Sequence, residues 1–268
     1  MSSRTPAEVV QMARGHTANT ALVLAIVAAL ALGFAGFGVE QRMFDLDYAV
    51  TVLATGWAPN LALLAAILGG LALLAAILVK PRRDFIPALL ALAMAGGALA
   101  VSERVRTREL SNPPIHDVAT DWAMPLMFSP SFAASGTEGA NRIEPDPKVQ
   151  PQPQDPNLTG TRVADVNART CHGAAPLVLT TSTQAAYAKA RAALVRDGEM
   201  LATEDPDVGR LEAVATTKWL KLVSDVVVRI KPEGSGARID IRSISRTGVR
   251  DLGENCARVT RLRAMMGK

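Results

Sequence analysis

The pattern of apolar and polar residues divides the chain into two parts. Residues 18–38, 61–79 and 85–101 are apolar runs without a charged side chain, whereas residues 102–268 carry most of the charges. A helix needs about 20 apolar residues, within a range of about 17 to 25, to cross the hydrocarbon of a bilayer. We therefore expect an N-terminal bundle of three transmembrane helices, which forms a membrane anchor at residues 1–109.

Lysine and arginine gather on one side of these predicted spans. They precede the first span and separate the second from the third, as Arg4, Arg14, Lys80, Arg82 and Arg83. Because such residues accumulate in cytoplasmic loops, we predict a multi-pass protein of the inner (cytoplasmic) membrane with a cytoplasmic N-terminus and a periplasmic C-terminal domain. Three basic residues just beyond the third span oppose this orientation: Arg104, Arg106 and Arg108.

Glycines interrupt the spans, whereas ionisable residues do not. The glycines are Gly33, Gly36, Gly38, Gly69, Gly70, Gly96 and Gly97. Small residues let helix backbones approach closely in a membrane, which favours packing of the spans with one another, with a second copy in a homo-oligomer or with a membrane-protein partner. Intramembrane charges are typical of transporters and proton relays, so the spans do not indicate a channel or a pump.

Residues 110–128 form a juxtamembrane segment that we assign to the soluble domain. His116, Asp117 and Asp121 fall within six residues of one another and could be metal ligands. A site needs more ligands than this short cluster supplies, and aspartates commonly form turns by accepting bonds from nearby amides. We therefore interpret the acids as turn residues and expect no metal ion and no other cofactor.

Residues 129–170 are rich in Pro, Asp, Asn, Gln and Gly and poor in apolar side chains. Such a composition buries too little surface to offset the entropy of ordering the chain. We expect a proline-rich linker that is semi-extended and holds the domain at residues 171–268 away from the bilayer.

The last hundred residues alternate between strand and helix patterns. Strands are predicted at 176–180, 199–203, 210–217, 225–231 and 238–245, and helices at 185–196 and 252–266. Consecutive strands joined by short turns pair antiparallel, and helices gathered beside such a sheet give an α+β fold. We predict an antiparallel sheet with two helices packed on one face, while the other face is solvated or meets a ligand, a partner or the membrane.

The stretch from 240 to 258 combines a strand, a turn at Gly248 and the start of the last helix. Alternation places Asp240 and Arg242 on one side of the strand, away from its isoleucines. Asp251 and Glu254 match a capping box, in which the first acid accepts from the free amides of the helix.

This stretch resembles the domain-of-unknown-function family numbered 1499. The resemblance rests on R-S-x-S-R-x-G-x-x-D-L-G-x-N at 242–255, I-H-D-V-A-T-D at 115–121 and D-V-V-V-R-I at 225–230. It covers about residues 110–268 and implies a membrane-anchored domain of this fold but no reaction, because the family has no established activity. Two positions depart from its pattern, Ser224 and Cys256.

Two interpretations of the arginines remain open. In one, the helix N-terminus and its flanking arginines bind an anion; in the other, arginines and aspartates pair to fix the sheet against the last helix. The candidate ligand-binding residues are Arg229, Asp240, Arg242, Ser245, Arg246, Asp251, Asn255 and Arg258. The second interpretation pairs Arg242, Arg246 and Arg258 with Asp225, Asp240 and Asp251.

Other chemistry is poorly supported. Ser243 and Ser245 have no nucleophile elbow, and the low aromatic content of 4% gives little reason to expect nucleic-acid binding. Cys256 falls on the predicted core stripe of the last helix as a small apolar filler, or else forms a disulfide with Cys171.

We therefore expect a non-enzymatic envelope protein whose tethered domain binds an anionic lipid, a cell-wall polymer or a protein partner. The alternatives are an enzyme with an Asp/Arg cleft at the strand-to-helix turn, and an assembly factor for a membrane complex.

Overall fold

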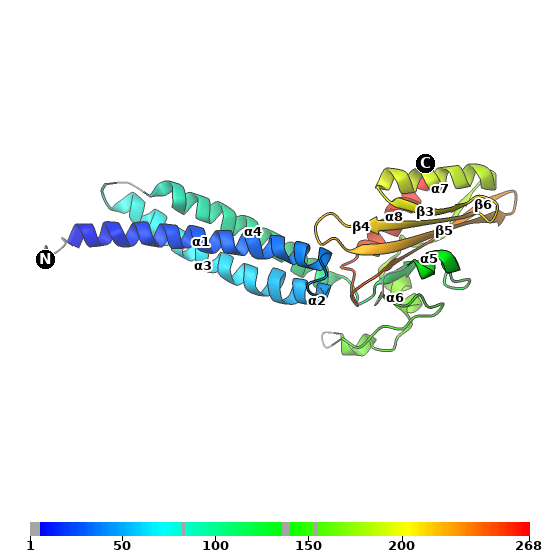
Figure 1. Ribbon diagram of the computed structural model, residues 1–268, viewed down its shortest axis with the longest axis horizontal. Helices are drawn as coiled ribbons and strands as arrows, with labels where there is room; N and C mark the ends of the chain where they lie inside the picture. Colours follow the sequence, from blue (N-terminus) through cyan, green and yellow to red (C-terminus); the bar gives the residue numbers. More distant parts are fainter. Residues whose placement is uncertain (1–5, 82–83, 136–139, 153–154) are drawn as a thin grey trace. The chain divides into compact units, whose positions relative to one another are not determined.

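The computed structural model describes residues 6–81, 84–135, 140–152 and 155–268. The chain divides into two compact units, with the boundary in the sequence between Arg108 and Glu109. The helices of the first unit are α1 (Pro6–Glu40), α2 (Leu46–Tyr48), the π-helix η1 (Ala49–Trp57), α3 (Ala58–Leu78) and α4 (Phe85–Ser111). The helical stretches Glu8–Glu40, Leu46–Leu78 and Phe85–Ser111 are long and apolar enough to cross a membrane (Figure 1). Three long apolar helices are thus confirmed.

Alanine rather than glycine lines the inner faces of these helices. The buried small residues of α3 recur every three or four positions, as Ala58, Ala62, Ala65, Gly69, Ala72 and Ala76. This spacing keeps one helix face inward. The close packing expected of the glycines is found at Gly38, whose added Cβ would clash with the Phe44 ring, and at Gly69, whose added Cβ would lie 3.3 Å from Leu92. Gly33, Gly70, Gly96 and Gly97 face open space.

Arg14 is buried on α1 and bonds to the end of α3. Its Nε lies 3.0 Å from Asp84 Oδ2, and its Nη1 donates to the carbonyls of Val79 and Pro81 at 3.1 Å. Carbonyls at a helix C-terminus lack intrahelical donors, so one guanidinium satisfies them and joins the two helices.

The second unit is built on an antiparallel sheet with the strand order β1-β6-β5-β4-β3, in which β2 also pairs with β6. Its strands are β1 (Asp117–Ala119), β2 (Leu177–Leu179), β3 (Met200–Asp205), β4 (Arg210–Thr216), β5 (Val223–Glu233) and β6 (Gly236–Ser245). Its helices are α5 (Pro130–Ala134), η2 (Pro156–Leu158), α6 (Val163–Thr170), α7 (Thr183–Asp197) and α8 (Glu254–Met266).

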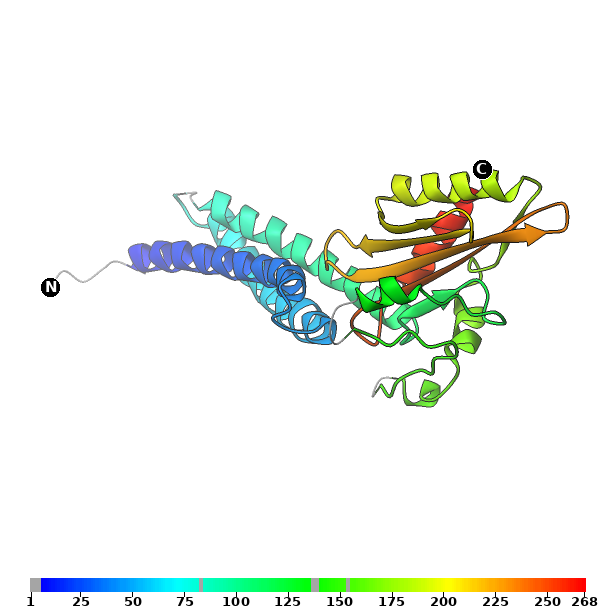
Figure 2. The ribbon, with the colours of Figure 1, turned by 45° about the vertical axis from the view of Figure 1, so that its right-hand side comes forward.

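Helices α7 and α8 cover one face of the sheet, as expected from the sequence (Figures 1 and 2). Ser182 begins α7 by accepting a bond from the Ala185 amide at 3.2 Å, and Gly198 ends it with φ of 87°. Leu194 of α7, Leu262 of α8 and Ile241 of β6 are fully or almost fully buried in the shared core. Burial of such side chains is the main favourable term in folding.

The other face of the sheet is also covered, which corrects the expectation that helices cover one face and leave the other open. Leu126, Phe128 and Phe132 pack on Val227 and Ile244 of that face. Leu126 and Phe128 lie in the juxtamembrane segment, and Phe132 lies near the start of the proline-rich segment. The average composition of these two segments does not reveal such isolated large apolar side chains.

The described part of residues 129–170 packs against the domain, which differs from the expected extended linker. Val149, Val163 and Val166 are buried in the main core, and α6 includes the last two. Asn141 donates to the carbonyls of Ser245 and Gly248 at 2.9 Å. A few valines and backbone bonds to neighbouring strands therefore order a segment whose average composition indicates disorder; residues 136–139 and 153–154 lie outside the described residues.

Candidate functional site

Arg242 lies on the face of β6 opposite α8 and is completely buried. Its Nε and Nη2 bond to the two oxygens of Asp117 at 3.0 and 2.6 Å. Its Nη1 donates to the Leu126 carbonyl at 2.8 Å, and its Nη2 to the Glu144 carbonyl at 2.6 Å. All three guanidinium nitrogens thus form hydrogen bonds within the protein. The Trp122 ring also lies against the guanidinium, with 5.2 Å between Cζ and the ring centroid.

Asp240 lies on the same face and belongs to a network of four charges. Arg229 and Arg238 each bond to both Asp121 and Asp240, at 2.9 Å in every case. Burial alone would raise the pKa of Asp121, but the Met124 amide and the two arginines outweigh it and hold this pKa below its usual value. Asp121 also accepts from the Ala123 and Met124 amides at 3.0 Å, as expected of a turn residue.

A second polar cluster lies between β6 and α8. Ser243 Oγ donates to Asn255 Oδ1 at 2.7 Å, and Asn255 Nδ2 donates to Ser245 Oγ at 2.9 Å and to the His116 carbonyl at 2.8 Å. Arg258 Nη1 donates to Asn255 Oδ1 at 3.0 Å. The bonds of Asn255 to Ser243, Ser245 and the His116 carbonyl join α8 to β6 and to the start of the domain, which fixes the last helix on the sheet.

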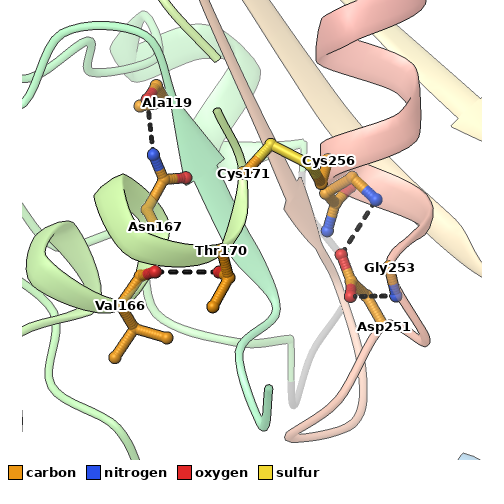
Figure 3. Close-up of a disulfide and its surroundings, with 9 residues drawn as sticks. Ala119, Val166, Asn167, Thr170, Cys171, Asp251, Gly253 and Cys256 are labelled. Carbon is orange, nitrogen blue, oxygen red and sulfur yellow. Dashed lines mark hydrogen bonds between the residues drawn. A yellow bond between two sulfur atoms is a disulfide. The ribbon is translucent and has the colours of Figure 1, made fainter. Parts of the chain in front are cut away.

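Asp251 lies at the start of α8, beside the disulfide (Figure 3). It accepts from the amides of Gly253 and Asn255 at 2.8 and 2.9 Å, so the expected role as a helix-start acceptor is met. The N-cap itself is Gly253 with φ of 78°, which differs from the capping box expected. Burial raises the pKa of Asp251 to about 6, although the two amides oppose the shift.

Glu199 is the acid that faces Arg258, with 3.2 Å between Oε1 and Nε. Burial raises the pKa of Glu199 to about 7, because the loss of hydration outweighs the attraction of Arg258. The sequence pairing of Arg258 with Asp225, Asp240 or Asp251 missed this acid, which precedes β3.

The eight predicted ligand residues therefore divide between the two faces of the sheet. Arg229, Asp240 and Arg242 lie on the face covered by residues 121–132, whereas Ser245 lies on the opposite face against Asn255 and Arg258 of α8. Arg246 pairs with Asp225 at 2.7 Å, the one expected ion pair that is found. A single pocket lined by Arg242, Arg246 and Asp251 is not formed.

A pocket that the sequence did not indicate lies beside Arg242. It encloses about 330 Å³ and is lined by His116, Arg142, Glu144, Asp146, Pro147, Lys148 and Gln150. Burial lowers the pKa of His116 below its usual value, despite the opposing effect of Asp117. The run of alternating prolines and charges at 144–148 was the signal available in the sequence.

The charged side chains of this pocket are Arg142, Lys148, Glu144 and Asp146. Asp146 is bonded to Arg162 at 2.8 Å. Among the residues that the structure describes, no ion pair is found for Arg142, Lys148 or Glu144, and these three side chains are exposed. The pocket can therefore offer two cationic donors and a neutral imidazole to a small polar molecule, beside one carboxylate.

A disulfide joins Cys171, at the end of α6, to Cys256 in the first turn of α8 (Figure 3). The sequence left this bridge open. It closes a loop of 85 residues and ties the end of the proline-rich segment to the last helix.

Comparison with known proteins gives one match. Residues 148–266 match the family described as "Protein of unknown function (DUF1499)". This confirms the resemblance for that part of the chain; the segment at 115–121 lies outside the match. No curated protein and no solved structure matches the chain.

Proposed function

We propose that this chain, whose residues 148–266 match the DUF1499 family, is an envelope protein anchored in the inner membrane, with a periplasmic domain that binds a small anionic ligand without transforming it. The proposed ligand is a phosphate or carboxylate group of a lipid head group or a cell-wall polymer. The cations of the His116 pocket are the observation that carries this proposal.

Two observations support the location. The three long apolar helices have the length and composition of membrane spans. The Cys171–Cys256 disulfide is of a kind that persists in oxidising compartments such as the periplasm and is rare in the cytosol. Together with the basic residues before the first span, they favour a cytoplasmic N-terminus and a periplasmic domain.

Binding is better supported than catalysis. The enzyme alternative needs Asp225, Asp240 and Asp251 in one cleft, but Asp251 accepts two amides at the start of α8 and Asp240 bonds to two arginines. In the β5–β6 register Asp225 faces Ile244, four residues from Asp240 along the strand, or about 13 Å. These acids are occupied by structural bonds, whereas the pocket cations are not.

The test uses inorganic phosphate titrated into the full chain in nanodiscs, followed by isothermal calorimetry. We expect saturable binding that weakens at higher salt, because screening reduces attraction between exposed charges. The variant Arg142→Ala/Lys148→Ala should bind more than about tenfold more weakly, since a hydrogen bond to a charged group contributes about 1.5–3 kcal/mol. The control Arg196→Ala removes an exposed arginine of α7 and should bind normally.

If Arg142→Ala/Lys148→Ala binds phosphate as tightly as the parent and the control Arg196→Ala do, the pocket is not an anion site. Phosphate binding that is independent of salt would also contradict an anion site at this pocket.

An assembly role through the spans is the second candidate. An apolar groove of about 540 Å³ on the first unit is lined by residues of α1 and η1, including Gly33, Phe34, Phe37 and Leu53. Small residues beside such a groove favour close approach of another helix. Gly33→Leu should then reduce cross-linking between copies, or to a partner, in membranes, whereas Ala100→Leu on the exposed side of α4 should not.

A further inference from the structure

The loop between β4 and β5, residues 217–222, carries the sequence T-K-W-L-K-L and exposes one aromatic side chain between two lysines. Trp219 is 38% exposed and is the one aromatic among the exposed large hydrophobic residues in the described part of residues 109–268. Leu220 and Leu222 point inward and are buried. The loop therefore presents a basic and aromatic surface on an apolar foundation.

The backbone holds this loop in a defined shape. The Thr217 amide donates to the Leu222 carbonyl at 3.0 Å, and Thr217 Oγ1 accepts from the Leu222 amide at 2.9 Å. Lys221 has φ of 51°, a left-handed conformation that non-glycine residues seldom adopt. The loop is therefore closed by two hydrogen bonds, and it carries the partly exposed Trp219 between Lys218 and the buried Leu220.

The sheet topology places this loop at the same end of the sheet as the start of β1. Asp117, which begins β1, faces Ile244, and Ser224, at the start of β5, faces Ser245. Two to three strand spacings, or about 10–14 Å, separate the start of β1 from the β4–β5 loop.

The connection between the apolar run of α4 and β1 is short. Ten helical residues follow Val101 up to Ser111 and contribute about 15 Å at about 1.5 Å per residue. Residues 112–116 then lead to Asp117, which adds at most about 20 Å of extended chain. If α4 spans a bilayer, this tether is short enough for the loop of residues 217–222 to contact the head groups.

We propose that the loop of residues 217–222 binds the surface of an anionic phospholipid bilayer, with Trp219 at the head groups and Lys218 and Lys221 facing lipid phosphates. Tryptophan is enriched at membrane interfaces, and each basic residue near an anionic surface contributes favourably to binding. This contact requires that α4 spans the membrane, but it does not depend on the anion pocket. It gives the domain a second attachment beside its covalent link to α4.

The experiment places the full chain in nanodiscs of phosphatidylglycerol or of phosphatidylcholine, each with a nitroxide-labelled lipid whose label lies near the head groups. The fluorescence of Trp219 is obtained as the difference between the parent and Trp219→Phe. We expect the labelled lipid to quench Trp219 in phosphatidylglycerol and aqueous iodide to quench it in phosphatidylcholine. Quenching of Trp57, obtained in the same way with Trp57→Phe, reports insertion of the spans separately.

The lysines provide the matched variants. Lys218→Gln and Lys221→Gln should each lower the contact equilibrium about fivefold, whereas Lys231→Gln, near the opposite end of β5, should leave it unchanged. If Trp57 is quenched by the labelled lipid while Trp219 is equally open to iodide in both lipids, the loop does not bind the bilayer. Equal behaviour of the Lys218 and Lys231 variants would contradict the charge contribution, and a protein partner for the loop would then have to be sought.

Discussion

At the scale of single residues, the domain depends on charges that are buried and paired across long sequence distances. Arg242 bonds to Asp117, which lies 125 residues earlier in the chain. The alternation of β6 predicted which side of the strand carries Arg242, but strand alternation says nothing about which segment covers that side. The partners Asp117, Asp121 and Glu199 were therefore missed, although the arginines themselves were identified.

Replacing Arg242 with alanine should destabilise the domain strongly. The change leaves Asp117 buried without its cation and leaves the Leu126 and Glu144 carbonyls without a donor. Removing one partner of a buried ion pair costs about 3–5 kcal/mol, which guanidinium denaturation of the full chain in detergent can measure. Arg191→Ala breaks an ion pair with Glu204 that is exposed and should change stability little; an equal loss in both variants would contradict the assigned role.

The contribution of Glu199 to stability should fall as the pH rises from about 4.5 to about 7, whereas His116, whose pKa is lowered by burial, contributes in the opposite direction. Burial raises the pKa of Glu199 in the folded state to about 7, above its ordinary 4.5, so the folded state holds this proton more tightly than the unfolded state. The resulting stabilisation is complete below the ordinary pKa and is lost as the pH rises through the raised one. Asp251, whose pKa is raised to about 6, adds to the same trend at lower pH.

The measurement is the thermal midpoint of the domain between pH 4 and 8. The parent midpoint minus that of Glu199→Gln should decrease as the pH rises towards 7, whereas the same difference for Glu233→Gln, in the exposed end of β5, should stay constant. Identical pH profiles for the parent and Glu199→Gln would be inconsistent with a buried, proton-binding Glu199.

At the scale of elements, local sequence signals predicted the main helices and strands of the domain well. They did not predict that residues 126–132 and the described part of residues 140–170 pack on the sheet. The predicted strand at 238–245 lies within β6 (Gly236–Ser245), and the predicted helix at 252–266 overlaps α8 (Glu254–Met266). These elements follow from periodicity and turn residues alone. The order in residues 140–152 and 155–170 comes instead from contacts with distant strands, which composition cannot reveal.

Two glycines with left-handed backbones provide a matched test of one turn. Gly209 has φ of 71°, and a Cβ there would clash with the Ile230 carbonyl oxygen. Gly198 has φ of 87°, and a Cβ there would meet open space. Gly198→Ala should cost about 1 kcal/mol from backbone strain alone. Gly209→Ala should cost clearly more, because β4 and β5 must also separate; equal thermal midpoints for the two variants would contradict the close approach.

The disulfide should stabilise the domain by constraining its unfolded chain. It closes a loop of 85 residues, and removal of such a bridge typically costs about 2–5 kcal/mol. Reductant should therefore lower the guanidinium midpoint of the parent to that of Cys171→Ser/Cys256→Ser and leave the double variant unchanged. A parent midpoint that ignores reductant would show that the bridge contributes nothing to stability.

At the scale of the whole molecule, the sequence predicted the division into an apolar helical part and a charged α+β part, because hydropathy changes sharply near residue 101. The proposed pocket at 142–150 was missed because it lies in a segment that composition marked as a linker. The central claim is that the apolar helices are anchored in a membrane and hold the disulfide-bonded domain outside the cytoplasm.

Cysteine labelling tests this claim most directly. Ser235→Cys places a thiol in the exposed β5–β6 turn, and Lys80→Cys places one between α3 and α4; the native cysteines are bridged and do not react. In intact spheroplasts, a membrane-impermeant maleimide should label Ser235→Cys, while Lys80→Cys should react only after lysis. Labelling of Lys80→Cys in intact spheroplasts, with Ser235→Cys protected until lysis, would contradict the account.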